Sequence, residues 1–300
     1  MEKKPVILLL IAFLLLFGCK GKPESDREQY DEQHTDEAYG EPSGTVTLPD
    51  TIKSKTPNLG EISAYEYTWS KSDDLPDMVI IIDDFGQTGG ELLDDFAKLP
   101  SAVALAILPD LPHTEATAKL AHQTNHEILI HIPMQAEGNA NPGKRFVKQG
   151  MKPDEISNLI ADFHSQMPKA IAANNHMGSA ATADYEVMTT VMKQLDNLGM
   201  FFVDSATTAK SAVPTVASKL GQKTLKRDVF MDVPDVTDAT IIAKIQGLSK
   251  YKGRNEPIVV ITHCHNRAKL EALEKFISQV TSMGIKLIPP SKALRKASVS

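Results

Sequence analysis

Aspartate, histidine and asparagine side chains end the short apolar runs of this sequence. Asp83 and Asp84 end the first run, His131 ends the third and His263 ends the seventh. The fourth, fifth and sixth runs carry further polar groups, namely Asn174, Asn175, His176, Asp204, Arg227 and Asp228. A single aspartate after a strand often caps a helix, and a single histidine is usually a core or surface group. Such groups on so many separate runs indicate a shared site, because carboxylates and imidazoles bind divalent ions and transfer protons.

The apolar runs alternate with amphipathic stretches after Pro76, which is the pattern of repeated βα units. Strands are predicted at 78–82, 103–108, 127–132, 171–174, 201–203, 226–230, 258–261 and 286–288. Predicted helices between them include 90–98, 153–166, 185–198 and 267–283. Seven or eight such units favour a single (β/α) barrel domain, with a doubly wound parallel sheet as the alternative. In a barrel the carboxyl ends of the strands surround one site, so the polar groups should converge there.

The N-terminus has the features of an export signal. Lys3 and Lys4 precede an apolar run from Val6 to Phe17, which is too short to span a bilayer comfortably. The segment Leu16-Phe17-Gly18-Cys19 resembles the lipobox of bacterial lipoproteins. That resemblance implies a signal peptide over 1–18, a lipid on Cys19 and an exported protein anchored at the cell envelope. A plain signal peptide or an uncleaved anchor is the alternative.

The composition divides the rest of the chain into a tether, a domain and a tail. Residues 19–77 are rich in acidic residues, Pro, Ser, Thr and Gly, so they are predicted to form a disordered tether after the lipidated cysteine. Within it, residues 65–69 are candidates for docking on the domain. The folded domain is predicted over 78–290 and a flexible tail over 291–300.

Charge and cysteine content restrict the partners and the source of stability. A net charge of −6 and a pI near 5.9 argue against a nucleic-acid partner. Apart from Cys19, the sequence has one cysteine, Cys264, so we expect no internal disulfide and a fold stabilised by its packed core.

Five segments resemble the motifs of the divergent polysaccharide deacetylase family, part of the glycoside hydrolase/deacetylase barrel superfamily. They are Ile81-Ile82-Asp83-Asp84-Phe85-Gly86, the run from Asn125 to Met134, Asn174-Asn175-His176-Met177-Gly178-Ser179, Phe202-Val203-Asp204-Ser205 and Arg227-Asp228-Val229-Phe230. Their order matches the family, and they cover nearly the whole predicted domain. The resemblance implies a carbohydrate substrate and one divalent metal ion.

The resemblance also implies roles for particular residues. Asp83 corresponds to the catalytic base, Asp84 to a metal ligand and His131 to the first ligand histidine, whereas Gln135 occupies the position of the second. An amide is a poor replacement for imidazole, so His176 is predicted to be the third ligand. This set suits zinc, although manganese, cobalt or nickel would also fit.

Further predicted roles surround this ligand set. His263 is expected to protonate the leaving amine, Asp204 and Arg227 to orient neighbouring groups, and Asn175 and Ser205 to bind substrate. In the segment Thr262-His263-Cys264-His265, one histidine is expected to face the site while Cys264 packs as a small buried residue, and the choice between the two histidines stays open.

Two functions are compatible with these residues. The first is a metal-dependent hydrolase that removes N- or O-acetyl groups from an envelope glycan. The second is a barrel with weak or lost catalysis that binds glycan or serves envelope assembly. Gln135 favours the second, whereas Asp83, Asp84, His131, His176 and His263 favour the first. The superfamily also keeps glycoside hydrolysis among the possible activities.

Overall fold

The computed structural model describes residues 61–69 and 75–297. The predicted signal peptide, the lipid site at Cys19 and most of the predicted tether lie outside these residues. Within 61–69 and 75–297, no helix combines the length and the apolar character that a membrane span requires.

The centre of the domain is a parallel eight-stranded sheet. Along the sheet the strand order is β6-β5-β4-β3-β2-β1-β8-β7. Several strands are buried along their whole length, which is expected where both faces of a parallel sheet are covered. The strands are β1 (Met78–Phe85), β2 (Ala104–Ile107), β3 (Ile128–Met134), β4 (Ala172–Met177), β5 (Phe201–Asp204), β6 (Leu225–Lys226), β7 (Val229–Phe230) and β8 (Ile258–His263).

The sheet is a curled half-barrel whose two edge strands are close in sequence. Only Arg227 and Asp228 separate β6 from β7, yet β6 pairs with β5 and β7 pairs with β8 at the opposite edge. The predicted single strand 226–230 therefore bends and divides between the two edges. The strand order follows the chain without the reversal that a doubly wound sheet requires, so the barrel prediction is confirmed.

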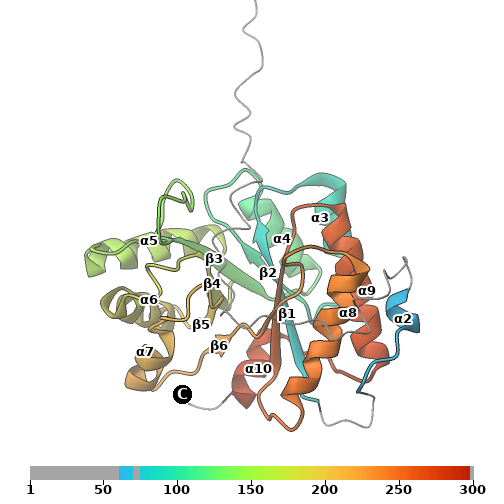
Figure 1. Cartoon of the computed structure of the whole chain (residues 1–300). Helices are drawn as coiled ribbons and strands as arrows, with labels where there is room; N and C mark the ends of the chain where they lie inside the picture. The colour runs from blue at the N-terminus through green and yellow to red at the C-terminus, as the bar shows by residue number, and fades with distance from the viewer. Residues whose placement is uncertain (1–60, 70–74, 298–300) are drawn as a thin grey trace, which may run out of the picture. The chain divides into compact units, whose positions relative to one another are not determined.

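Helices surround the sheet (Figure 1). They pack large apolar side chains such as Phe96, Phe163 and Phe276 against the strands in the main core. Side chains of Asp184, Thr237 and Asn266 cap three of the helices by accepting hydrogen bonds from first-turn backbone N–H groups. The helices are α2 (Glu61–Ala64), α3 (Gly90–Phe96), α4 (Thr114–Gln123), α5 (Pro153–Gln166), α6 (Tyr185–Asn197), α7 (Val213–Leu220), α8 (Asp238–Gln246), α9 (Arg267–Ser282) and α10 (Pro290–Lys296), with a 3-10 helix η2 (Gly247–Tyr251).

The C-terminal segment is structured, which corrects the predicted flexible tail over 291–300 as far as residue 297. Helix α10 places Ala293, fully buried, in a second apolar cluster with strand residues such as Ile81 and Leu129. The backbone N–H of Ser291 donates a 2.9 Å hydrogen bond to Glu127. Burial of small side chains holds α10 on the domain although its exposed face is polar.

Two other predicted boundaries differ from those of the structure. The segment 286–288 makes one isolated bridge, Met78 to Leu287, so it is not the predicted eighth strand. Before the sheet, Trp69 is 3% exposed and its indole N–H donates a 2.9 Å hydrogen bond to the carbonyl of Ile245 in α8. Docking of 65–69 is thereby confirmed, and the folded unit begins earlier than residue 78.

Candidate metal centre

Three buried side chains from three strands of the sheet converge at one point. Asp84 comes from β1, His131 from β3 and His176 from β4, and one potential ligand atom from each lies within 4.8 Å of the others. Oδ1 of Asp84 lies 3.1 Å from Nε2 of His131 and 2.9 Å from Nδ1 of His176. The structure thus brings together the three residues predicted as ligands.

A bulge in β1 allows two consecutive aspartates to face the same site. Adjacent strand residues normally point to opposite faces. The register between β1 and β2 shifts between Ile82 and Phe85, and Asp84 has a left-handed φ of 68°. As a result Oδ2 of Asp83 lies 3.7 Å from Nε2 of His131, close to the Asp84 contact. Left-handed backbone is costly for most residues but is tolerated by aspartate.

The three converging atoms fit a divalent cation. Oδ1 of Asp84, Nε2 of His131 and Nδ1 of His176 are buried and have no hydrogen-bond partner, although they are near each other. Buried polar atoms without a partner are unfavourable, and a cation at their centre would satisfy all three. Carboxylate and imidazole donors in this number are typical of a zinc site with an open position. Other divalent transition metals accept the same donors.

The two aspartates differ in their electrostatic environment. Burial opposes ionisation of Asp84, but His176, His131 and His265 outweigh it and hold its pKa well below the usual range. Burial dominates at Asp83, where it raises the pKa despite the opposing effect of His131 and His263. Asp84 is therefore suited to bind a cation, and Asp83 to accept a proton.

Asn174, to which no role was assigned from the sequence, contacts both the proton acceptor and a ligand. Its Oδ1 lies 2.8 Å from Nδ1 of His131, directly across the β3–β4 register, and its Nδ2 donates a 2.8 Å hydrogen bond to Asp83. An amide oxygen can only accept, so Nδ1 of His131 carries the proton and Nε2 presents its lone pair to the centre. The sequence could have indicated this role through strand alternation. Asn174 and His176 are two residues apart and therefore share one face of β4.

His263, the predicted acid, lies beside an aspartate that the sequence analysis missed. Its Nδ1 lies 3.0 Å from Oδ2 of Asp232, and its backbone N–H donates to the same carboxylate. Burial would lower the pKa of His263, but Asp232 overcomes this effect and raises it to about 9. His263 is therefore protonated at neutral pH. Asp232 follows the run 229–231, so it had the same signal as the predicted residues: an acidic group after a strand.

Both histidines of the 262–265 segment face the site, which corrects the prediction that only one does. Nε2 of His265 lies 2.7 Å from Oδ2 of Asp84, and its ring stacks on that of His263 at 5.3 Å between centroids. Cys264 between them is buried on the opposite side, where Sγ lies 3.7 Å from Oγ1 of Thr88. The alternation of the extended chain explains why two residues separated by one share a face.

Comparisons with known proteins agree with this fold and identify a family. Residues 80–294 match the family model described as divergent polysaccharide deacetylase. The chain belongs to this family.

The Escherichia coli (strain K12) protein YibQ is 33% identical over 221 residues, which are 74% of this chain and 66% of YibQ. A Haemophilus influenzae (strain ATCC 51907 / DSM 11121 / KW20 / Rd) protein is 35% identical over 181 residues, or 60% of this chain and 64% of the relative. The match thus spans just under two thirds of each relative's length.

A solved structure shares the fold of this member of the divergent polysaccharide deacetylase family. The uncharacterized protein ATU2773 from Agrobacterium tumefaciens C58 superposes with a TM-score of 0.64 at 21% identity, covering 78% of this chain and 95% of that one. At this identity the likeness concerns the fold.

In this deacetylase-family chain, two residues predicted to orient neighbouring groups stabilise the loop after β5. Asp204 accepts hydrogen bonds from the backbone N–H of Ala206 at 2.8 Å and from the hydroxyl of Ser211 at 2.7 Å. Arg227 donates to the carbonyls of Ser205 and Ala206 at 2.7 and 2.9 Å. Both side chains therefore hold the backbone of this loop, and their role in orienting the site stays a prediction.

The two predicted substrate-binding residues are also buried, Asn175 in β4 and Ser205 at the start of this loop. The amide of Asn175 accepts from the backbone N–H of Ser205 at 2.9 Å and donates to the carbonyl of Met177 at 2.6 Å. These contacts tie Asn175 to the backbone on both sides, and its predicted contact with substrate stays a prediction. The Ser205 hydroxyl lies 3.3 Å from Nδ2 of Asn174, close to Asp83, and its contact with substrate stays a prediction.

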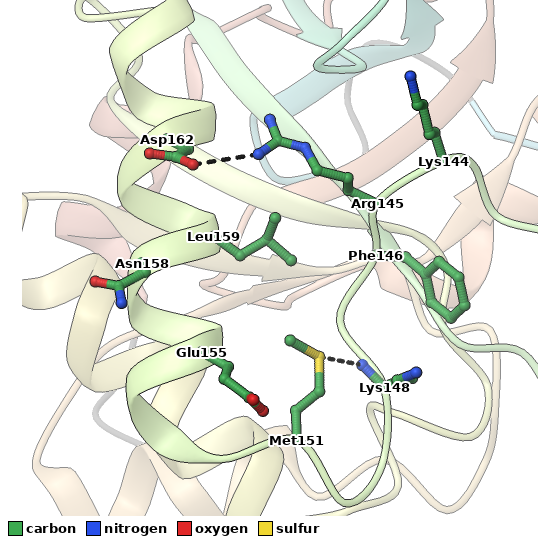
Figure 2. A pocket seen from close by; sticks show the side chains of 9 residues that line it. All are labelled: Lys144, Arg145, Phe146, Lys148, Met151, Glu155, Asn158, Leu159 and Asp162. Carbon is green, nitrogen blue, oxygen red and sulfur yellow. Dashed lines mark hydrogen bonds and ion pairs between the residues drawn. The ribbon is translucent and has the colours of Figure 1, made fainter.

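Gln135, which the resemblance places at the position of the second ligand histidine, has a structural contact. Its Oε1 accepts a 2.9 Å hydrogen bond from the backbone N–H of Gln149, so the side chain holds the segment that follows β3. Figure 2 shows this segment beside α5, where they enclose a groove of about 470 Å³. Arg145 reaches from this segment to Asp162 on α5 and also pairs with Asp110. The departure at Gln135 is thus compatible with a ligand set that uses His176 instead.

Proposed function

We propose that this protein is a metal-dependent deacetylase that removes N- or O-acetyl groups from an envelope glycan, with zinc as its ion. The observation that carries the proposal is the group of three buried, unpartnered ligand atoms on Asp84, His131 and His176. A proton acceptor, Asp83, and a protonated histidine, His263, flank this group. Hydrolysis of an acetyl group needs these two proton-transfer functions.

Each side chain has a distinct task in this proposal. Asp84, His131 and His176 would hold the ion, which when bound supplies Lewis acidity to an acetyl carbonyl and to water. Asp83 accepts the proton of the attacking water, and the hydrogen bond from Asn174 fixes the orientation of its carboxylate. His263, held by Asp232, donates a proton to the leaving nitrogen or oxygen. His263 stays buried and charged because the Asp232 carboxylate is its immediate neighbour.

The proposed location follows from the N-terminal sequence. The apolar run that ends at Cys19 supports export and lipid anchoring, which would keep the domain at the cell envelope beside its carbohydrate substrate. The acidic residues after Cys19 support a tether between the anchor and the domain.

Elemental analysis and an acetate-release assay test the proposal. The full-length protein, purified without added metal or chelator, is expected to contain about one zinc per chain, and His131→Ala and His176→Ala should lose it. Zinc-loaded wild type should release acetate from acetylated envelope glycans. Asp83→Asn should retain the ion but lose activity by about 10²- to 10⁴-fold.

Two outcomes would change the proposal. A wild-type protein that takes up no ion even from excess zinc would contradict it. Zinc uptake without acetate release from any acetylated glycan would favour the second function, glycan binding by a barrel without catalysis.

A further inference from the structure

Lys269 occupies a position that its own helix does not favour. It lies in the first turn of α9, where its backbone N–H is capped by Oδ1 of Asn266 at 3.0 Å. The first turn carries the positive end of the helix dipole, so a cation there is electrostatically unfavourable. The Lys269 side chain is nevertheless only 16% exposed and points inward, which requires compensating contacts.

Two such contacts face the candidate centre. Nζ of Lys269 lies 3.1 Å from Oδ2 of Asp232, whose side chain is fully buried beside His263. The same Nζ lies 3.1 Å from Nδ1 of His265. One ammonium group thus contacts both the partner of the predicted acid and the histidine that reaches Asp84.

These contacts determine which nitrogen of His265 carries the proton. An ammonium group donates hydrogen bonds and accepts none, so Nδ1 of His265 must accept from Lys269. Nε2 then bears the proton and donates to Oδ2 of Asp84 at 2.7 Å. This hydrogen bond occupies Oδ2 and leaves Oδ1, the unpartnered oxygen, directed at His131 and His176.

We propose that Lys269 is a positioning residue that acts through His265 on Asp84 and through Asp232 on His263. It holds His265 as the Nε2–H tautomer, which orients the Asp84 carboxylate, and it anchors the Asp232 carboxylate that supports the acid. The proposal rests on the proposed metal-dependent function for its catalytic consequence. The tautomer of His265 is independent of any activity.

Three variants of the full-length protein test this proposal. Lys269→Met removes the ammonium group at nearly constant side-chain length, and Lys269→Arg restores donors and charge. Arg267→Met is the matched control, because Arg267 lies in the same turn of α9 but pairs with Asp95 away from the site. Thermal unfolding of all three shows whether each remains folded.

The first measurement is NMR of the metal-free protein with 15N-labelled histidine, which distinguishes the two ring tautomers. His265 is expected to be the Nε2–H form in wild type, Arg267→Met and Lys269→Arg, with an Nδ1 resonance shifted by the hydrogen bond that it accepts. Lys269→Met should lose this Nδ1 shift, although Asp84 still accepts from Nε2–H. The second is competition with a chromophoric chelator, in which Lys269→Met should bind zinc about tenfold more weakly. In acetate release, Lys269→Met should reduce kcat more than it changes KM, and Lys269→Arg should restore much of the loss.

The results separate this inference from the proposed function. If Lys269→Met keeps the wild-type Nδ1 resonance of His265 and the wild-type zinc affinity, the role of Lys269 is wrong even when the protein is an active deacetylase. If the Nδ1 resonance of His265 shifts and zinc binds more weakly in Lys269→Met while wild type releases no acetate, Lys269 has its positioning role and the proposed catalysis fails.

Discussion

Asn174 donates a 2.8 Å hydrogen bond from Nδ2 to Oδ1 of Asp83. Because its Oδ1 also lies 2.8 Å from Nδ1 of His131, a single amide links the predicted base to a predicted ligand. The two halves of the amide therefore serve different steps, one orienting the group that accepts a proton and the other orienting the ring that binds the ion.

Substitutions at Asn174 should separate these two effects. Asn174→Asp keeps an acceptor for His131 but places a second carboxylate beside Asp83, so we expect near-normal zinc affinity and a large loss of kcat. Asn174→Ala removes both hydrogen bonds, and its zinc affinity should fall by about 10- to 100-fold. Chelator competition and acetate release measure the two quantities. Equal zinc affinity in the two variants would contradict the proposed contact with His131.

The pairing of His263 with Asp232 should make stability depend on pH. The pKa of His263 rises from its ordinary 6.5 to about 9 in the folded protein, so folding favours the protonated form. This contribution is complete below about pH 6.5 and is lost as the pH rises through about 9, a change on the order of 3 kcal/mol. The free energy of unfolding from denaturant titrations should fall over this range.

Asp232→Asn is the control for this pH effect. It removes the carboxylate that raises the pKa of His263, so its unfolding free energy should change much less between pH 6.5 and 9. Parallel pH profiles for wild type and Asp232→Asn would show that another group causes the dependence.

Gly86 is required by both its backbone conformation and its neighbours. It has a φ of 117°, and a Cβ built there would lie 2.8 Å from the carbonyl oxygen of Leu108, which is backbone and cannot move aside easily. Gly90 also has a positive φ, 64°, but a Cβ there would meet nothing within 4 Å. Gly86→Ala should therefore lower the free energy of unfolding by about 1–3 kcal/mol more than Gly90→Ala. Similar losses in urea titrations would contradict the clash.

Trp69 should contribute to stability although it precedes the predicted domain. Its side chain is 3% exposed and donates a hydrogen bond to Ile245. Trp69→Ala removes the buried ring and should cost about 3 kcal/mol or more, whereas Trp69→Phe loses mainly the hydrogen bond and should cost about 1 kcal/mol. Thermal and urea unfolding measure both. If Trp69→Ala were as stable as wild type, residues 61–69 would belong to the tether and not to the folded domain.

The fold followed from local patterns because strands and helices differ in the period of their apolar residues. Helix α5 begins and ends at the predicted residues 153 and 166, and seven of the predicted strands lie on observed ones. Errors arose where pairing decided the outcome. The run 286–288 is apolar enough for a strand but finds one bridge, and 226–230 divides because its two ends pair with different strands.

The sequence by itself determined the barrel, the family and the chemical types at the strand ends, including Asp84, His131 and His176. Only the tertiary structure decided how these groups face one another. The bulge that turns Asp84 beside Asp83, the choice of Asp232 as the partner of His263, and the link from Lys269 through His265 to Asp84 all depend on it. The physical reason is that periodicity specifies which face a side chain occupies, whereas hydrogen bonds between residues as distant as Asp84 and His265 form only once the sheet has curled.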